Sequence, residues 1–288
     1  MVTHVTVDKS VTVIPARAFA GHPNIVEVVL HDKVERIERA AFNLCPSLRR
    51  VIMPGVEVVE RHSFYCCGFL TNAECGKLEI IREDAFGNCL SLSSIDLPSA
   101  KVIDHQAFAG TALTNVKFGD KLERIEEQAF VGCRSLERIT IPFKDGMITH
   151  SDTFYLCENL KHVDLVEGEL HETIAALQLG EWRNDMYEEI DSINQILPDT
   201  PARGLNYDNE GKAWAIQTWI RSVLRKIVHY IAEHQRVLNL EVETTLRFVL
   251  PQDIVMKNVL PYLELPSFTF EVGDNEEVEE DSDDEEGR

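Results

Sequence analysis

The sequence lacks the short motifs by which most enzyme families are recognised. It contains no Gly-x-Ser-x-Gly nucleophile elbow, no glycine-rich phosphate loop and no His-Glu-x-x-His zinc motif. It also lacks pairs of potential ligands at the spacing that metal sites use. Because catalysis and cofactor binding need such arrangements, we expect a protein that is not an enzyme and holds no cofactor or metal.

Basic charge and long apolar runs are scarce. The 288 residues include 49 acidic and 28 basic ones, which gives a formal net charge of -21. A nucleic-acid-binding protein needs a positive stripe, so we expect no DNA or RNA partner. No stretch approaches the roughly 20 apolar residues of a membrane span, and the first ten residues do not match a secretory signal. We expect a cytoplasmic protein, with the nucleus as the alternative.

Cysteine motifs are missing too. The chain has seven cysteines but no Cys-x-x-Cys pair, and an odd number without a secretory signal argues against a disulfide framework. Five of them recur at one position of a repeat, which predicts free thiols buried side by side: Cys45, Cys67, Cys89, Cys133 and Cys157.

That repeat is marked by a phenylalanine every 22 to 24 residues, at Phe19, Phe42, Phe64, Phe86, Phe108, Phe130 and Phe154. A small residue precedes each one, and an aliphatic residue lies five positions before six of the seven. A run of the form Leu-x-x-Val/Ile-x-Leu/Met/Ile follows, often closed by proline, as in Leu48, Val51, Met53 and Pro54. Alternation with a proline stop is typical of a short strand, and the fixed period predicts a solenoid.

These columns resemble leucine-rich repeats, in particular the BspA-like subclass, whose consensus has Ala-Phe, a downstream cysteine and a Leu-x-x-Ile-x-Leu-Pro strand. The resemblance implies an α/β fold: a right-handed solenoid of short parallel strands, with about seven repeats over residues 1–167. Two copies depart from the pattern. Ala73 and Cys75 occupy strand positions that hold larger aliphatic residues elsewhere, and Thr111 stands in the cysteine column.

The strand residues that alternate with the buried ones form the candidate binding surface. Solenoids use an extended concave face for recognition, so we expect a protein-interaction module or scaffold that binds a protein partner here. A merely solvated face is the alternative. The residues are Glu27, Arg50, Ile52, Asn72, Glu74, Ser94, Asp96, Asn115, Lys117, Arg138, Thr140, His162 and Asp164.

A second function class rests on one cluster. Cys66 lies beside Cys67, with His62 four residues earlier, and this is the sequence's closest approach to a reactive thiol site. The alternative function is therefore a thiol-based catalytic or redox-sensing protein that uses these three residues.

Residues 168–266 have helical periodicity. Apolar residues from Leu170 to Leu197 predict one helix that ends at Pro198, and a run from Ala213 to Leu238 predicts a longer one. The first is acidic and the second basic, which favours an antiparallel hairpin over a basic helix aimed at an anionic partner. We expect this hairpin to cap the solenoid, anchored by Trp182, Trp214 and Trp219. A homodimer through the helical region is the alternative.

Residues 267–288 end the chain in an extended segment and an acidic tail. Eleven acidic residues lie between Glu271 and Glu286, which predicts disorder because so little apolar surface can be buried. Ser282 precedes four acidic residues and is a candidate phosphorylation site; a purely solubilising tail is the alternative. Together with the helical segment, this tail makes the chain resemble BspA-like proteins of unicellular algae.

Overall fold

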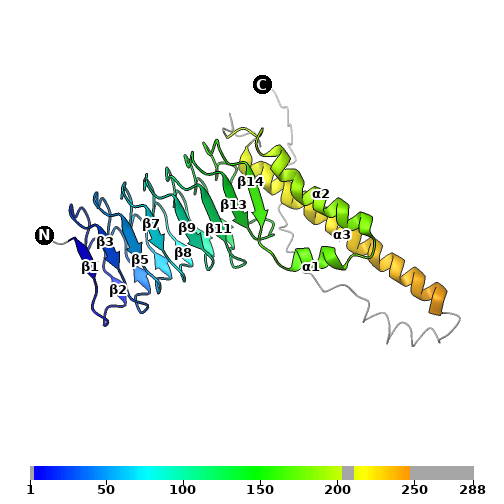
Figure 1. The fold of residues 1–288 in the computed structure, drawn as a ribbon, viewed down its shortest axis with the longest axis horizontal. Helices are drawn as coiled ribbons and strands as arrows, with labels where there is room; N and C mark the ends of the chain where they lie inside the picture. Colours follow the sequence, from blue (N-terminus) through cyan, green and yellow to red (C-terminus); the bar gives the residue numbers. More distant parts are fainter. Residues whose placement is uncertain (1–2, 203–210, 247–288) are drawn as a thin grey trace, which may run out of the picture.

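The computed structural model describes residues 3–202 and 211–246, and its first part is a solenoid of parallel strands (Figure 1). One side of the solenoid is an eight-stranded sheet in the order β1-β3-β5-β7-β9-β11-β13-β14. All its neighbouring strands are parallel, as the repeat predicts. The strands are β1 (His4–Thr6), β3 (Glu27–Val29), β5 (Arg50–Ile52), β7 (Asn72–Glu74), β9 (Ser94–Leu97), β11 (Asn115–Phe118), β13 (Arg138–Ile141) and β14 (His162–Leu165).

A second parallel sheet of six strands forms the opposite side. Its strands contain the aliphatic residues that lie five positions before the first six phenylalanines. The sequence pattern did not show that these positions are extended. Each strand has only two residues, too few for alternation to be visible. They are β2 (Val13–Ile14), β4 (Arg36–Ile37), β6 (Val58–Val59), β8 (Ile80–Ile81), β10 (Val102–Ile103) and β12 (Arg124–Ile125).

The core lies between the sheets and is organised around the phenylalanine column. The rings stack from Phe19 to Phe154 with centroids 5.0 to 5.6 Å apart. The cysteine column runs beside it, and each thiol donates to the carbonyl of the phenylalanine one repeat earlier, as Cys89 Sγ does to Phe64 O at 3.1 Å. The expectation of free, buried thiols in this column is confirmed.

The helical segment consists of α1 (Glu169–Ala176), α2 (Gly180–Ile196) and α3 (Lys212–Leu246). The prediction of one helix from Leu170 to Leu197 is wrong at one point. Leu177 has an extended backbone (φ -60°, ψ 133°), which ends α1, and its side chain is buried in the core. The backbone is also extended at Leu179, just before α2, so residues 177–179 divide a run whose apolar spacing is helical throughout.

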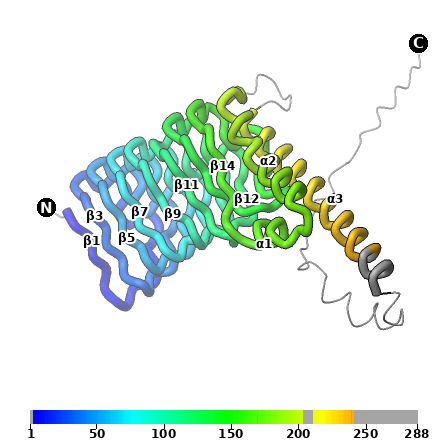
Figure 2. Tube along the Cα trace, turned by 45° about the vertical axis from the view of Figure 1, so that its right-hand side comes forward, coloured from blue at the N-terminus to red at the C-terminus, as the bar shows by residue number. Residues whose placement is uncertain are grey.

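The predicted antiparallel hairpin is formed by α2 and α3, which lie side by side (Figures 1 and 2). Lys226 Nζ lies 2.9 Å from Asp185 Oδ1 and 3.1 Å from Glu189 Oε2. Earlier along α3, the Trp219 indole donates to the Glu189 carbonyl at 3.0 Å, and the Ser222 hydroxyl donates to Glu189 Oε1 at 2.7 Å. Basic α3 thus forms ion pairs with acidic α2 inside the molecule.

The hairpin covers the last repeat, at the end of the solenoid away from the N-terminus (Figure 2). The Asn194 side chain accepts a hydrogen bond of 2.8 Å from the Val163 amide of β14. The buried Lys212 ammonium donates to the carbonyls of Leu160 and Leu197 at 2.8 and 2.7 Å. One continuous apolar core joins solenoid and helices, so the capping prediction is confirmed.

One predicted anchor is wrong. Trp219 is buried and Trp182 stacks on Tyr230 at 5.5 Å, but Trp214 is 40% exposed.

Within the described ranges, none of the helices has both the length and the apolar run that crossing a membrane requires. Residues 247–266 of the predicted helical region, the tail over 267–288 and its candidate Ser282 lie outside the described residues. A homodimer through the helices stays a prediction.

Candidate protein-binding face

The sequence-predicted surface residues all lie on the solvent side of the eight-stranded sheet, which we call the eight-strand face. Strand register sets them in two rows that run along the solenoid. All are exposed or half-buried. The first row is Glu27, Arg50, Asn72, Ser94, Asn115, Arg138 and His162; the second is Ile52, Glu74, Asp96, Lys117, Thr140 and Asp164.

The N-terminal part of this face is tied together by charge. Arg50 lies between two carboxylates, with Nη1 3.5 Å from Glu27 and Nη2 2.6 Å from Glu74. The hydrogen bond from Arg50 to Glu74 raises the pKa of the guanidinium. Asn72 also donates to Glu74, at 3.3 Å. These side chains are held by one another and are already compensated.

The C-terminal part contains one further ion pair. Arg138 Nη1 lies 2.7 and 2.6 Å from the two carboxylate oxygens of Asp164. Both groups are partly exposed, so the pair adds little stability, but it fixes two long side chains in place.

The centre of the face differs from both ends. Asp96 on β9 and Lys117 on β11 are opposite each other in register, yet neither forms an ion pair within 4.0 Å with any side chain that the structure describes. In the described part of the chain, the Asn115 side chain donates only to the neighbouring Thr114 hydroxyl, at 3.2 Å. The centre therefore presents one acidic and one basic group that have no ion-pair partner among residues 3–202 and 211–246.

The ladder of the sheet is weakest beside this centre. Only Asn72 and Ser94 pair between β7 and β9, whereas β5 and β7 pair at three positions and β9 and β11 at four. A groove opens where the pairing stops. Its signal in the sequence was the departure at Ala73 and Cys75, but the residue pattern alone did not show that a groove would result.

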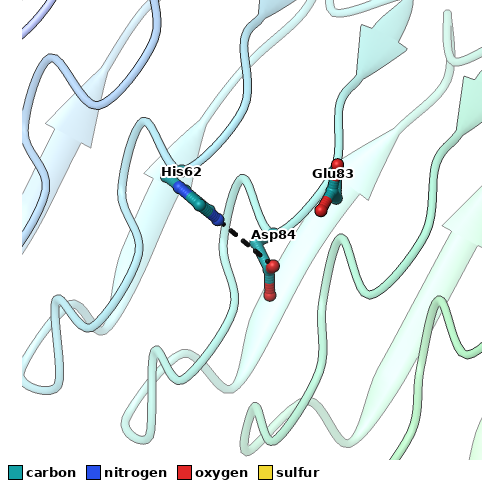
Figure 3. Close-up of side chains that lie close together, drawn as sticks. All are labelled: His62, Glu83 and Asp84. Carbon is teal, nitrogen blue, oxygen red and sulfur yellow. Dashed lines mark ion pairs between the residues drawn. The ribbon is translucent and has the colours of Figure 1, made fainter.

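On the other side of the solenoid, His62, Glu83 and Asp84 gather at a turn (Figure 3). His62 and Asp84 occupy the same repeat position, both in the left-handed region with φ of 59° and 54°. The His62 ring points toward Asp84, with Nε2 3.3 Å from Oδ2. One donor atom from each of the three lies within 4.8 Å of the others, so they could together hold a divalent metal. However, Glu83 is already paired with Arg61 at 2.7 Å.

The predicted thiol cluster is split between different environments. Cys67 is fully buried, and its hydrogen bond with Cys45, together with burial, raises its pKa. Its Sγ donates to Phe42 O at 3.1 Å. Cys66 is half-buried with φ of 58°, outside the cysteine column. The geometry therefore joins His62 to carboxylates and gives Cys67 a place in the core.

Comparison with known families gives a match to the BspA type leucine rich repeat region, with six copies over residues 1–101 and 79–176. None of the curated proteins matches the chain. Among solved structures, a leucine-rich repeat protein from Bacteroides ovatus has 27% identity and a TM-score of 0.49; the match covers 58% of this chain and 43% of that one. The T. pallidum leucine rich repeat protein has 24% identity and a TM-score of 0.39, with 56% and 69% covered.

Proposed function

The chain belongs to the BspA-type leucine-rich repeat family, and from that membership we propose that it is a non-enzymatic protein-interaction module whose partner binds the eight-strand face. The observation that carries the proposal is the contrast within this face. Its two ends are closed by internal ion pairs, whereas Asp96 and Lys117 at its centre have no ion-pair partner among the described residues.

This contrast suits recognition for two reasons. The paired side chains at the ends are already ordered, so a partner that covers them loses little side-chain entropy. The two central charges can each gain a partner across an interface, and such complementary charges set which partner binds and in which orientation. A face that served solvation alone would need no such arrangement.

The partner is a protein rather than a nucleic acid in this proposal. The net charge of -21 repels phosphate backbones and attracts basic protein surfaces. The chain would then serve as a scaffold: a rigid solenoid that presents the face, with one end sealed by the helical hairpin.

Site-directed photo-cross-linking tests this function. A photoreactive phenylalanine analogue is placed at Asn115, in the centre of the face, and in a control at Glu57, an exposed position before β6 of the opposite sheet. We expect a partner to cross-link at position 115 in extracts of the native cells and not at position 57. Equal cross-linking at both positions, or cross-linking at position 57 alone, would overturn the proposal.

A further inference from the structure

The groove in the eight-strand face has the size of a small binding site. Its volume is 330 Å³, at the lower end of the range for ligand pockets. The Asn72–Ser94 pair bounds one end of the strand opening. The Ser99 hydroxyl bounds the other, because it donates to the Gly76 carbonyl at 3.0 Å. The opening can therefore receive a single side chain and not a whole strand.

Small, uncharged groups line the inside of the groove. Ala73 and Cys75 replace the larger Val51 and Met53 of the preceding repeat, and both are buried. The Cys75 thiol donates to the Asp96 carbonyl at 3.6 Å, across the gap between the strands. Burial, with the nearby Asp96 carboxylate, raises the pKa of Cys75 to about 12, so the thiol is neutral at pH 7.

Two carboxylates stand at the rim. Glu74 and Asp96 each lie two residues beyond the Asn72–Ser94 pair, so they face each other across the gap. Like charges at opposite positions of a sheet repel. Arg50 compensates Glu74 from the β5 side, but no described cation lies within 4.0 Å of Asp96. A positive group between the two carboxylates would remove this repulsion.

We propose that the groove binds an arginine side chain of the partner protein. The planar guanidinium carries five donors and can bond to Asp96 and Glu74 together, while its aliphatic stem lies along the apolar lining of Ala73 and Ile95. The negative charge of the whole chain favours a basic partner. This inference rests on the proposed function for the identity of the partner as a protein, and it adds the chemistry that this protein must present.

A probe titration of the full chain tests the groove directly. N-acetylarginine amide is the probe, and N-acetylcitrulline amide, which has nearly the same shape without the charge, is its control. We expect the arginine probe to shift amide resonances of residues 72–76 and 94–98 in NMR spectra, and the citrulline probe to leave them unchanged. Equal shifts with both probes would overturn the proposal, and so would a lysine probe that binds as tightly as arginine.

Two variants locate the effect. Asp96→Asn keeps the shape and removes the charge, and we expect about tenfold weaker probe binding, the effect of one lost charge-assisted hydrogen bond. Asp120→Asn makes the same charge change at an exposed residue after β11, outside the groove, and should leave probe binding unchanged. If both variants weakened probe binding equally, the net charge of the protein would explain the effect, and the proposal would be overturned.

A third variant closes the groove. Cys75→Leu introduces at this position the leucine that the next repeat has there, Leu97 of β9. The larger side chain should fill the groove while the solenoid stays folded. We expect probe binding to be lost with no fall in melting temperature. Probe binding that persists in a folded Cys75→Leu protein would overturn the proposal.

The same variants separate this inference from the proposed function. In one outcome, a partner cross-links at position 115, and Asp96→Asn changes neither this cross-link nor the binding of the arginine probe. The groove proposal then fails, and the interaction function stands. If the arginine probe binds in an Asp96-dependent way but no partner cross-links at position 115, the interaction function fails, and with it the assignment of the arginine to a partner.

Discussion

Replacement of Phe86 by alanine tests whether the phenylalanine column holds the repeats together. Phe86 is fully buried, and its ring stacks on Phe64 and Phe108 with centroids 5.2 and 5.4 Å away. Loss of this ring removes buried apolar surface and leaves a cavity that the rigid repeats on either side can fill only in part. We therefore expect the free energy of unfolding to fall by about 3 to 5 kcal/mol.

Phe19→Ala is the matched control in the same column. Phe19 is only half-buried and stacks on one neighbour, Phe42, at 5.0 Å. Because less surface and one contact fewer are lost, the fall should be roughly half as large or smaller.

Urea unfolding followed by circular dichroism measures both changes. The midpoint should move markedly for Phe86→Ala and slightly for Phe19→Ala, with little change in the slope, which reports the surface exposed on unfolding. Equal shifts in the two variants, or an unchanged midpoint for Phe86→Ala, would refute the reasoning from the stacked column.

Three further predictions concern the cap and the thiols. Burial lowers the pKa of His234, whose ring accepts a hydrogen bond from the Gln178 amide. The stability that neutral His234 contributes is therefore present above its ordinary pKa of 6.5 and is lost as the pH falls through the lowered pKa of the folded state. Tryptophan fluorescence should show the cap loosening on acidification, and His234→Gln should remove that pH dependence. Truncation after Val166 should expose the last repeat and give aggregates in light scattering, and a stable soluble monomer would contradict capping. Native thiol labelling should reach Cys66 and leave the six buried cysteines unreacted until unfolding, whereas a thiol that reacts much faster than free cysteine would support the thiol-based alternative.

The solenoid could be predicted because the repeats have the same residue types at equivalent positions. Stacking requires equivalent residues to lie above one another, so a column such as Phe19 to Phe154 fixes the register of the whole array. The two rows of the eight-strand face follow from that register and from alternation along each strand. The sequence thus placed the predicted residues in these rows, but it missed His4, Thr6 and Val29, which strand register adds to them, and it did not show how the side chains pair.

Other features depend on local geometry that no column records. Leu177 and Leu179 are extended between α1 and α2, and the helical spacing of the apolar residues on both sides conceals that break. The exposure of Trp214 depends on how α3 is rotated about its axis where it packs on the last repeat. At the groove, Ala73 and Cys75 were visible as departures, but small residues can be accommodated either by closer strands or by an opening. Only the loss of pairing between β7 and β9 decides between these outcomes.

The central claim is that a partner binds through the eight-strand face. Its most direct test uses the partner that cross-linking identifies, purified in its free form, and measures its binding to a variant of this face without the two central charges. The double variant Asp96→Asn/Lys117→Gln removes both central charges without changing the net charge. The control Glu57→Gln/Arg39→Gln does the same at two exposed residues next to β6 and β4 of the six-stranded sheet. By calorimetric titration we expect at least about tenfold weaker binding for the first variant, and unchanged binding for the second. Unchanged binding for the first variant, or equal weakening in both, would contradict recognition through the eight-strand face.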